Sequence, residues 1–186
     1  MLEIRWHGRG GQGAKTAAQF LAEAAIDAGK FIQSFPEYGP ERAGAPIRAY
    51  TRIDDVPIKL HCGVTEPEVV VVIDPTLATK QVLAGLGKDG ILVVNTHKSP
   101  EEIKKELNIT STKVATVDAT KISLELLGMS MPNTPMLGAV VKVKPAVPLD
   151  EVKKQIKRKF LKKLGEEKTN ANIAAVDRAY KEVKIS

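Results

Sequence analysis

A glycine-rich turn near the N-terminus constrains the fold of this chain more than any other feature. Gly8, Gly10 and Gly13 have the spacing G-x-G-x-x-G, and they follow residues 2–7, whose alternation is typical of a strand. Small apolar residues then recur at helical spacing until Gly29, where the predicted helix ends. This order of strand, glycine turn and helix predicts the first unit of an α/β sheet.

The rest of the chain continues the alternation of strands and helices. Residues 31–34 predict a second strand, which completes a βαβ unit of parallel sheet. The apolar run 69–73 is typical of a central strand buried on both faces. We expect all 186 residues to form a single three-layer, Rossmann-like α/β domain with an open, mostly parallel sheet and a hairpin. The other predicted elements are strands 47–53, 58–62, 91–95 and 113–118, a helix between residue 74 and Leu86, helices 101–107 and 119–127, and two C-terminal helices within residues 149–184.

Two irregular segments, residues 35–46 and 128–135, interrupt this alternation. Prolines and glycines hold the first of them out of helix and sheet. It carries Arg42, whose guanidinium suits a phosphate or a carboxylate because it can donate two parallel hydrogen bonds. An ion pair with Glu37 or Glu41 explains the same arginine nearly as well, and the aromatic residues of the segment also suit a subunit contact.

Several polar residues follow predicted strands or precede predicted helices. Asn133 and the threonine after it precede a helix, so N-capping alone explains them and ligand binding is the second interpretation. Asp74 and Asp118 end strands, and we interpret both first as caps; Asn95 stands at a similar position. His7 ends the first strand, where an orienting hydrogen bond is favoured over acid–base chemistry.

The net charge of +6 comes from 28 Lys and Arg against 22 Asp and Glu, and most of it lies near the C-terminus. From Asp150 onward there are 11 basic and 6 acidic residues, and apolar residues recur at helical spacing among them. This pattern predicts an amphipathic helix with a solvated lysine face. Aromatic residues do not alternate with the lysines as base stacking requires, and no apolar run is long enough to span a bilayer. We expect neither nucleic acid nor a membrane as a partner, and a cytoplasmic location.

Cys62 is the single cysteine of the chain. One thiol can form neither an internal disulfide nor a four-cysteine iron–sulfur site, and the three histidines are scattered along the sequence. We expect no metal site. Any redox cofactor must then be organic or lie on another chain.

The glycine turn supports more than one interpretation. Free amides at a helix N-terminus can hold a phosphate group, and Arg9 and Gln12 add polar groups that a packing turn does not need. A dinucleotide site would also need an acidic residue at the end of the second strand. That strand is predicted to end at residues 33–35, and the first acid, Glu37, lies beyond it. A stand-alone dinucleotide-binding oxidoreductase is therefore the alternative function, and a turn without a ligand is a third interpretation.

Three blocks of sequence together resemble one enzyme family. Residues 4–13 (IRWHGRGGQG) are similar to the signature of the gamma subunit of pyruvate:ferredoxin oxidoreductases and related 2-oxoacid:acceptor oxidoreductases. Residues 35–46 (FPEYGPERAGAP) resemble the second block of that family, and residues 133–138 (NTPMLG) the third. The resemblance runs in order over nearly the whole chain.

The resemblance implies an enzyme complex in which this chain does no redox chemistry alone. Such a complex converts pyruvate or another 2-oxoacid, coenzyme A and oxidised ferredoxin into an acyl-CoA, CO2 and reduced ferredoxin. Alpha, beta and delta subunits are implied as partners in a heterotetramer, with thiamine diphosphate and the iron–sulfur clusters on those subunits. This chain would bind no cofactor alone and would contribute to the coenzyme A side of the active region, without a catalytic residue. The candidate contacts are Gly10, Gly11, Gln12, Gly13, Arg42 and Asn133. The particular 2-oxoacid and the stoichiometry stay open.

Overall fold

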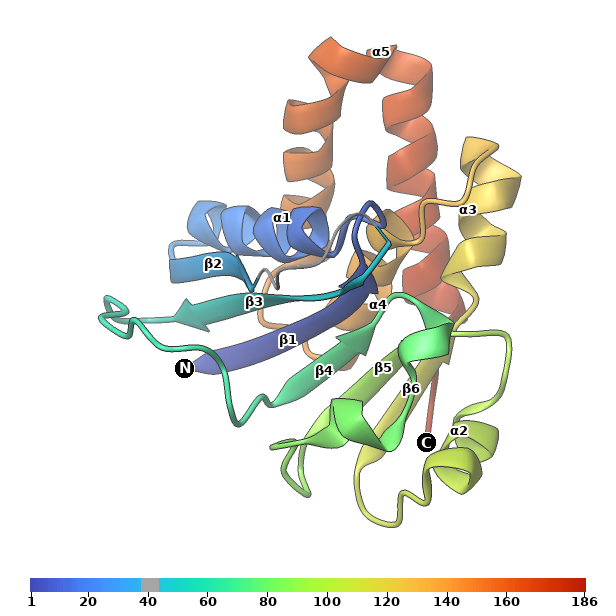
Figure 1. Ribbon diagram of the computed structural model, residues 1–186. Helices are drawn as coiled ribbons and strands as arrows, with labels where there is room; N and C mark the ends of the chain where they lie inside the picture. The colour runs from blue at the N-terminus through green and yellow to red at the C-terminus, as the bar shows by residue number, and fades with distance from the viewer. Residues whose placement is uncertain (38–43) are drawn as a thin grey trace.

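The computed structural model describes residues 1–37 and 44–186, which form a seven-stranded sheet with helices packed against it (Figure 1). The strands are β1 (Leu2–Arg9), β2 (Phe31–Glu37), β3 (Pro46–Asp54), β4 (Val69–Val72), β5 (Ile91–Asn95), β6 (Lys113–Val117) and β7 (Lys184–Ile185). The helices are α1 (Ala14–Asp27), α2 (Pro100–Leu107), α3 (Ala119–Leu127), α4 (Asn133–Val143) and α5 (Leu149–Glu182), with two 3-10 turns, η1 (Pro75–Leu77) and η2 (Lys80–Leu83).

The order of strands in the sheet is β2-β3-β1-β4-β5-β6-β7. The pairs β1–β4, β4–β5 and β5–β6 are parallel, whereas β3 runs antiparallel to both of its neighbours and β7 runs antiparallel to β6. The predicted α/β architecture with a mostly parallel sheet is thus confirmed, since five strands point the same way. The predicted βαβ unit is wrong in one respect, because β3 is inserted between β1 and β2.

The two faces of the sheet are covered differently (Figure 1). Helices α1, α3, α4 and α5 lie on one face and share the larger core with sheet residues such as Trp6 and Val71. On the other face, η1, η2 and α2 cover the β4–β6 half, where Val70 and Leu92 lie in a second, smaller core. Over the β2–β3–β1 half of that second face no α-helix of the described residues is packed, although η2 reaches Arg5 of β1 through Val82.

Two predicted elements downstream of β3 are absent from the described structure. Residues 58–62 form no strand, and the hairpin partner of β3 is instead β2, which precedes it. Residues 74–86 form η1 and η2 instead of an α-helix. Arg5 binds the end of this segment, because its Nη2 donates to the carbonyl oxygens of Val82 (3.0 Å) and Ala84 (2.6 Å).

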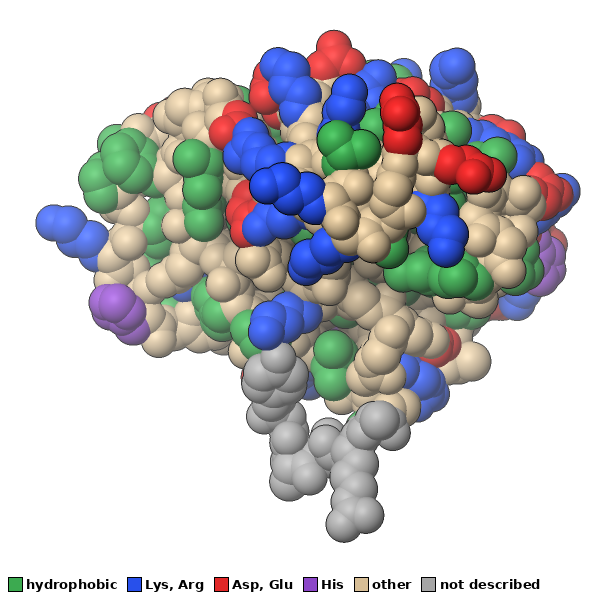
Figure 2. All heavy atoms as spheres, turned by 90° about the horizontal axis from the view of Figure 1, so that it is seen from above, with side chains coloured by type: hydrophobic (Ala, Val, Ile, Leu, Met, Phe, Trp, Pro, Cys, Tyr) green, Lys and Arg blue, Asp and Glu red, His purple; other side chains and the backbone are tan. Residues whose placement is uncertain are grey.

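The C-terminal helical segment α5 folds back on itself at Gly165, so the prediction of two C-terminal helices is confirmed (Figure 1). The predicted apolar face is only partly buried, because Leu161 and Leu164 at the bend are exposed. Its basic side chains alternate with carboxylates on the surface seen from above (Figure 2), and several are paired, as Arg158 is with Asp27. No helix of the described residues is both long and apolar enough to cross a membrane.

Candidate functional site

The candidate site lies where the chain leaves β1 and β4 at their carboxyl ends. After β1 the chain turns towards α1 on one face, and after β4 it turns into η1 on the other face. In open α/β sheets, ligands bind outside the carboxyl ends of parallel strands at such a switch in direction. The glycine turn, residues 10–13, stands at this point.

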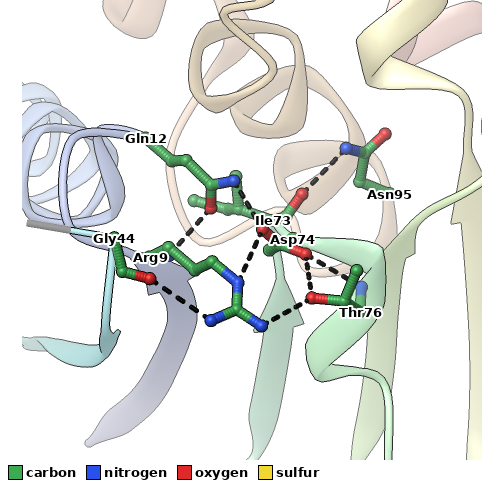
Figure 3. Close-up of polar contacts among 7 residues, drawn as sticks. All are labelled: Arg9, Gln12, Gly44, Ile73, Asp74, Thr76 and Asn95. Carbon is green, nitrogen blue, oxygen red and sulfur yellow. Dashed lines mark hydrogen bonds and ion pairs between the residues drawn. The ribbon is translucent and has the colours of Figure 1, made fainter.

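A network of polar contacts joins the glycine turn to the end of β4 (Figure 3). Gln12 accepts a hydrogen bond from the backbone N–H of Arg9 (2.8 Å) and donates from Nε2 to Oδ2 of Asp74 (2.5 Å). Arg9 Nε lies 3.3 Å from the same carboxylate oxygen, and its Nη2 donates to Oγ1 of Thr76 (2.9 Å). The side chains of Arg9 and Gln12 are therefore held in place before any ligand binds.

Asp74 is the centre of this network and is ionised in it. Its Oδ1 accepts hydrogen bonds from the backbone N–H (2.9 Å) and the hydroxyl (2.6 Å) of Thr76, which confirms the predicted capping role. Burial alone would raise the pKa of the Asp74 carboxyl, but the hydrogen bonds from Thr76 and Gln12 and the charge of Arg9 together hold that pKa below its ordinary value. The carboxylate and the Arg9 guanidinium balance each other in charge.

Only some amides of the glycine turn remain available to a ligand. The N–H of Gly10 donates to Ala45 (2.9 Å) and that of Gln12 to Arg9 (3.0 Å). The amides of Gly11 and Gly13 have no hydrogen-bond acceptor among the described residues. An anion at the turn would meet these two groups and the N-terminus of the 14-residue α1.

Asn133 is the polar side chain that closes the turn from the opposite side. It is the first residue of α4, and Pro132 takes the N-cap position without a side-chain cap, so the predicted capping role of Asn133 and Thr134 is wrong. A Cβ at Gly13 would lie 2.6 Å from Nδ2 of Asn133. Asn133 as a whole residue is 4% exposed, its side-chain amide makes no hydrogen bond within the described residues, and the amide atoms are not among the fully buried ones, so they are accessible at the turn. The N-terminal ends of α1 and α4 thus converge on an unpaired amide.

Arg42 lies outside the described residues, so its predicted contact is not placed by the structure. The chain re-enters the described part next to the turn, because the N–H of Gly44 donates to Gly10 (3.2 Å) and Arg9 Nη1 donates to the carbonyl of Gly44 (3.2 Å). The turn therefore anchors the returning end of the second sequence block.

The other polar residues at strand ends have structural partners. Asn95 donates from Nδ2 to the carbonyl of Ile73 (2.8 Å; Figure 3). It also donates to Thr120 (2.8 Å), and so ties the ends of β4 and β5 to α3. Asp118 accepts from the backbone of Lys121 (2.9 Å) and caps α3, as predicted. These contacts do not direct the side chain of either residue towards the glycine turn.

His7 does not act as an acid or base in this arrangement. Burial, together with the charges of Arg5 and Arg48, lowers its pKa to about 3, so the imidazole is neutral. Its Nε2 accepts a hydrogen bond from Arg5 Nε (3.1 Å), which confirms the predicted orienting contact.

The second strand ends on an acidic residue after all, because β2 extends to Glu37. Glu37 nevertheless stands two strands away from β1, with β3 between them, and it binds the hydroxyl of Tyr50 and pairs with Arg48 (3.7 Å). A ribose-binding acid in a dinucleotide fold lies on the strand next to β1. The geometry therefore does not favour the dinucleotide alternative.

Two contacts of the network were not predicted from the sequence. The bond of Thr76 to Asp74 follows a central strand and an Asp-Pro step, and the bond of Gln12 to Asp74 adds to the predicted cap. Within residues 1–37 and 44–186, no group of three or more His, Cys, Asp or Glu could hold a metal ion.

Comparisons with known sequences point to one family. The model of the family described as pyruvate ferredoxin/flavodoxin oxidoreductase matches residues 3–182. The chain is 52% identical over 185 residues to the pyruvate synthase subunit PorC of Thermotoga maritima, covering 100% of this chain and 96% of the relative. It is 52% identical over 172 residues to the pyruvate/ketoisovalerate oxidoreductases common subunit gamma of Pyrococcus abyssi, covering 92% and 93%.

Solved structures agree with the sequence comparisons. The crystal structure of the pyruvate oxidoreductase subunit PORC (EC 1.2.7.1) of Thermotoga maritima matches with a TM-score of 0.90 and 50% identity, over 100% of this chain and 98% of that one. A 2-oxoglutarate:ferredoxin oxidoreductase from Magnetococcus marinus, with 2-oxoglutarate, coenzyme A and succinyl-CoA bound, matches with a TM-score of 0.77 and 22% identity, over 96% of this chain and 30% of that one. The second likeness shows the fold alone.

Proposed function

The chain belongs to the pyruvate ferredoxin/flavodoxin oxidoreductase family, as the gamma subunit of a pyruvate or 2-oxoacid:ferredoxin oxidoreductase, and from that premise we propose that its glycine turn holds phosphate groups of coenzyme A. One observation carries this proposal: the Asn133 side-chain amide makes no hydrogen bond within the described residues and stands against Gly13 at the N-terminus of α1. An amide that is held against the turn with its hydrogen-bonding groups unused by the protein is available to a ligand, and a hydrogen bond to it would favour binding.

The turn offers an oriented, neutral set of donors to a phosphate. The amides of Gly11 and Gly13 and the N-terminal end of α1 favour an anion. Arg9 and Gln12 hold the turn in shape through Asp74, and some of their own donors are used in these contacts. Arg42 would add the positive charge that these amides lack, on the evidence of its place in the sequence alone.

Binding coenzyme A is a positional contribution to catalysis. Thiamine diphosphate and iron–sulfur clusters, which partner subunits would hold, supply the decarboxylation and electron-transfer chemistry. This chain would fix one end of coenzyme A and so hold the thiol near the acyl group. Such positioning lowers the entropic part of the activation barrier for acyl transfer. The chain alone is then expected to be inactive.

The direct test is the steady-state kinetics of the assembled enzyme. Asn133→Ala should raise the Michaelis constant for coenzyme A by about tenfold, which corresponds to the loss of about 1.4 kcal/mol of binding, and leave the constant for the 2-oxoacid unchanged. Asn170→Ala, an exposed amide on α5, is the matched control. An unchanged constant for coenzyme A in a normally assembled enzyme would contradict the proposal.

The contribution of Arg42 is tested in the same assay. Arg42→Ala should raise the Michaelis constant for coenzyme A, whereas Arg158→Ala, which removes an arginine paired with Asp27 far from the turn, should not. Equal Michaelis constants for coenzyme A in the two variants would exclude Arg42 from the coenzyme A site, but would not exclude binding by the glycine turn.

The partner subunits are tested separately. Anaerobic purification of the tagged full-length chain from its host should yield a thiamine-diphosphate-type subunit and a cysteine-rich, ferredoxin-like subunit in equal amounts, identified by mass. Recovery of the chain alone, or with nucleic acid, would contradict the proposed complex.

A further inference from the structure

Arg5 is a buried cation that has no counter-ion in the described structure. The residue is 5% exposed and lies in the middle of β1. Its guanidinium donates to His7 and to the carbonyl oxygens of Val82 and Ala84, which are all neutral groups. No carboxylate in residues 1–37 and 44–186 forms an ion pair with it, and Nη1 has no hydrogen-bond acceptor there.

Burying such a charge is costly. Burial lowers the pKa of the Arg5 guanidinium from its ordinary value, yet an arginine stays protonated near neutral pH. Buried charges in proteins are as a rule paired. A buried arginine with a free Nη1 is therefore an incomplete arrangement, unless an anion comes to it.

The β2–β3–β1 half of this sheet face provides a pocket for that anion. On this face the strand register aligns Arg5 with Tyr50 of β3 and Phe35 of β2 in one cross-strand row. Residues 63–65 and 84–85, which belong to no α-helix, lie beside this row. A pocket of about 550 Å³ opens over it, with Arg5, Tyr50 and Phe35 in its wall and Val64 and Ala84 at its side.

The charges around the pocket leave one positive charge in excess. Glu37 is the acidic residue in the pocket wall, and Arg48 stands beside it at 3.7 Å. The same carboxylate accepts the hydroxyl hydrogen bond of Tyr50. Two arginines, Arg5 and Arg48, thus face a single carboxylate, and that carboxylate is bound to groups other than Arg5.

We propose that this pocket binds a carboxylate group through Arg5. A carboxylate supplies the single negative charge that is missing, whereas a phosphate dianion would add repulsion from Glu37. The apolar part of the wall, Phe35, Val64 and Ala84, accommodates a short hydrocarbon chain. The carboxylate belongs to a small organic acid or to an Asp or Glu side chain of a partner subunit.

The test uses the full-length chain labelled with nitrogen-15. The Arg5 Nε–H, which is held by His7, gives a side-chain signal that isobutyrate should shift saturably at constant ionic strength. Isobutyramide, the neutral isostere, should leave this signal in place. Inorganic phosphate should bind more weakly than isobutyrate. No saturable shift with isobutyrate, an equal shift with isobutyramide, or tighter binding of phosphate would each overturn the proposal.

Variants provide a second measurement. Arg5→Gln should abolish the shift of the Tyr50 ring signals by isobutyrate, and Arg158→Gln, on the far face, should leave it unchanged. If Arg5→Gln does not fold, the comparison of isobutyrate with isobutyramide on the native chain still decides the question.

Equilibrium dialysis of labelled isobutyrate against the assembled complex distinguishes the two sources. Binding with the affinity of the free chain identifies a small organic acid as the occupant. Binding that is present in the free chain and lost in the complex identifies a side chain of a partner subunit. Both outcomes require that isobutyrate shifts the Arg5 signal in the free chain. Absence of that shift overturns the proposal, whether or not the glycine turn binds coenzyme A.

Discussion

The side chain of Gln12 donates a hydrogen bond of 2.5 Å to Asp74, and this contact joins the turn after β1 to the end of β4 across 62 residues of sequence. The Gln12 amide also accepts from the backbone of Arg9, so one side chain fixes the turn internally and to the neighbouring strand. The shape of the turn therefore depends on a residue of another strand.

Asp74→Asn should destabilise the protein. One amide oxygen cannot replace two carboxylate oxygens that accept from Gln12 and from Thr76, and the ion pair with Arg9 is lost. We expect a loss of about 1–3 kcal/mol in the free energy of unfolding, measured by urea denaturation at pH 7. Asp118→Asn is the matched control, because asparagine caps a helix as well as aspartate does. Equal stability of the two variants would contradict the role given to Asp74.

The native chain and the Asp74→Asn variant should also differ in how their melting temperatures respond to acid. The folded-state pKa of Asp74 is lowered, so its ionised form contributes stability above the unfolded pKa of about 3.9, and that contribution is lost as the pH falls through the folded pKa. The difference in melting temperature between the native chain and Asp74→Asn should therefore narrow as the pH is lowered below about 4. A constant difference down to the lowest pH would indicate that the charge of Asp74 is not involved.

Gly13→Ala should damage the turn in two ways. Gly13 has a φ of 79°, which strains an alanine, and the new Cβ would meet the amide of Asn133. Gly29→Ala isolates the first effect, because Gly29 has a φ of 77° and open space around it, and it should cost about 1 kcal/mol.

We expect Gly13→Ala to cost clearly more than this control in thermal unfolding, and Gly13→Ala/Asn133→Ala to recover part of the difference. Equal costs for Gly13→Ala and Gly29→Ala would show that Asn133 does not press on the turn.

His7 should not titrate in the physiological range. Its folded pKa is about 3, against about 6.5 in an unfolded chain, so the unfolded state binds more protons between these values and stability falls as the pH decreases from about 6.5. The Cε1–H signal of His7 in a nuclear magnetic resonance titration should stay constant from pH 8 to pH 5. A midpoint near the ordinary histidine value would contradict the burial of a neutral imidazole beside Arg5.

Gly138→Ala should weaken the packing of α4 on α5. A Cβ at this position would collide with the backbone carbonyl of Val176, which cannot rotate away as a side chain could. We expect a loss of about 3 kcal/mol in chemical denaturation. Gly87→Ala, where the added methyl group meets nothing within 4 Å, should change stability little. A small effect at Gly138 would mean that the two helices can move apart at low cost.

The parallel half of the sheet could be predicted from the sequence because its strands are buried on both faces. The runs that form β4 and β5 are continuously apolar, which is typical of buried parallel strands. Helix α3 begins and ends at the residues predicted from its pattern. The insertion of β3 between β1 and β2 could not be predicted, since periodicity identifies a strand but not its neighbour.

The missed parts of the site depend on contacts between distant residues. The segment after β4 is held by hydrogen bonds donated by Arg5, 77 and 79 residues away from its acceptors, and no local pattern shows such contacts. Asn133 resembled a helix cap because a local pattern cannot show that Gly13 lies against its side chain. The glycine turn itself could be predicted, because its residues are contiguous and glycine is needed locally.

The central claim is that the turn at Gly11 and Gly13 holds coenzyme A phosphates in the assembled enzyme. It is tested most directly by an electron cryomicroscopy structure of the complex with coenzyme A bound. We predict phosphate oxygens within hydrogen-bonding distance of the Gly11 and Gly13 amides, about 3 Å, and a contact with the Asn133 side chain. Coenzyme A bound elsewhere in the complex, with the turn and Asn133 unchanged from the free chain, would contradict the account.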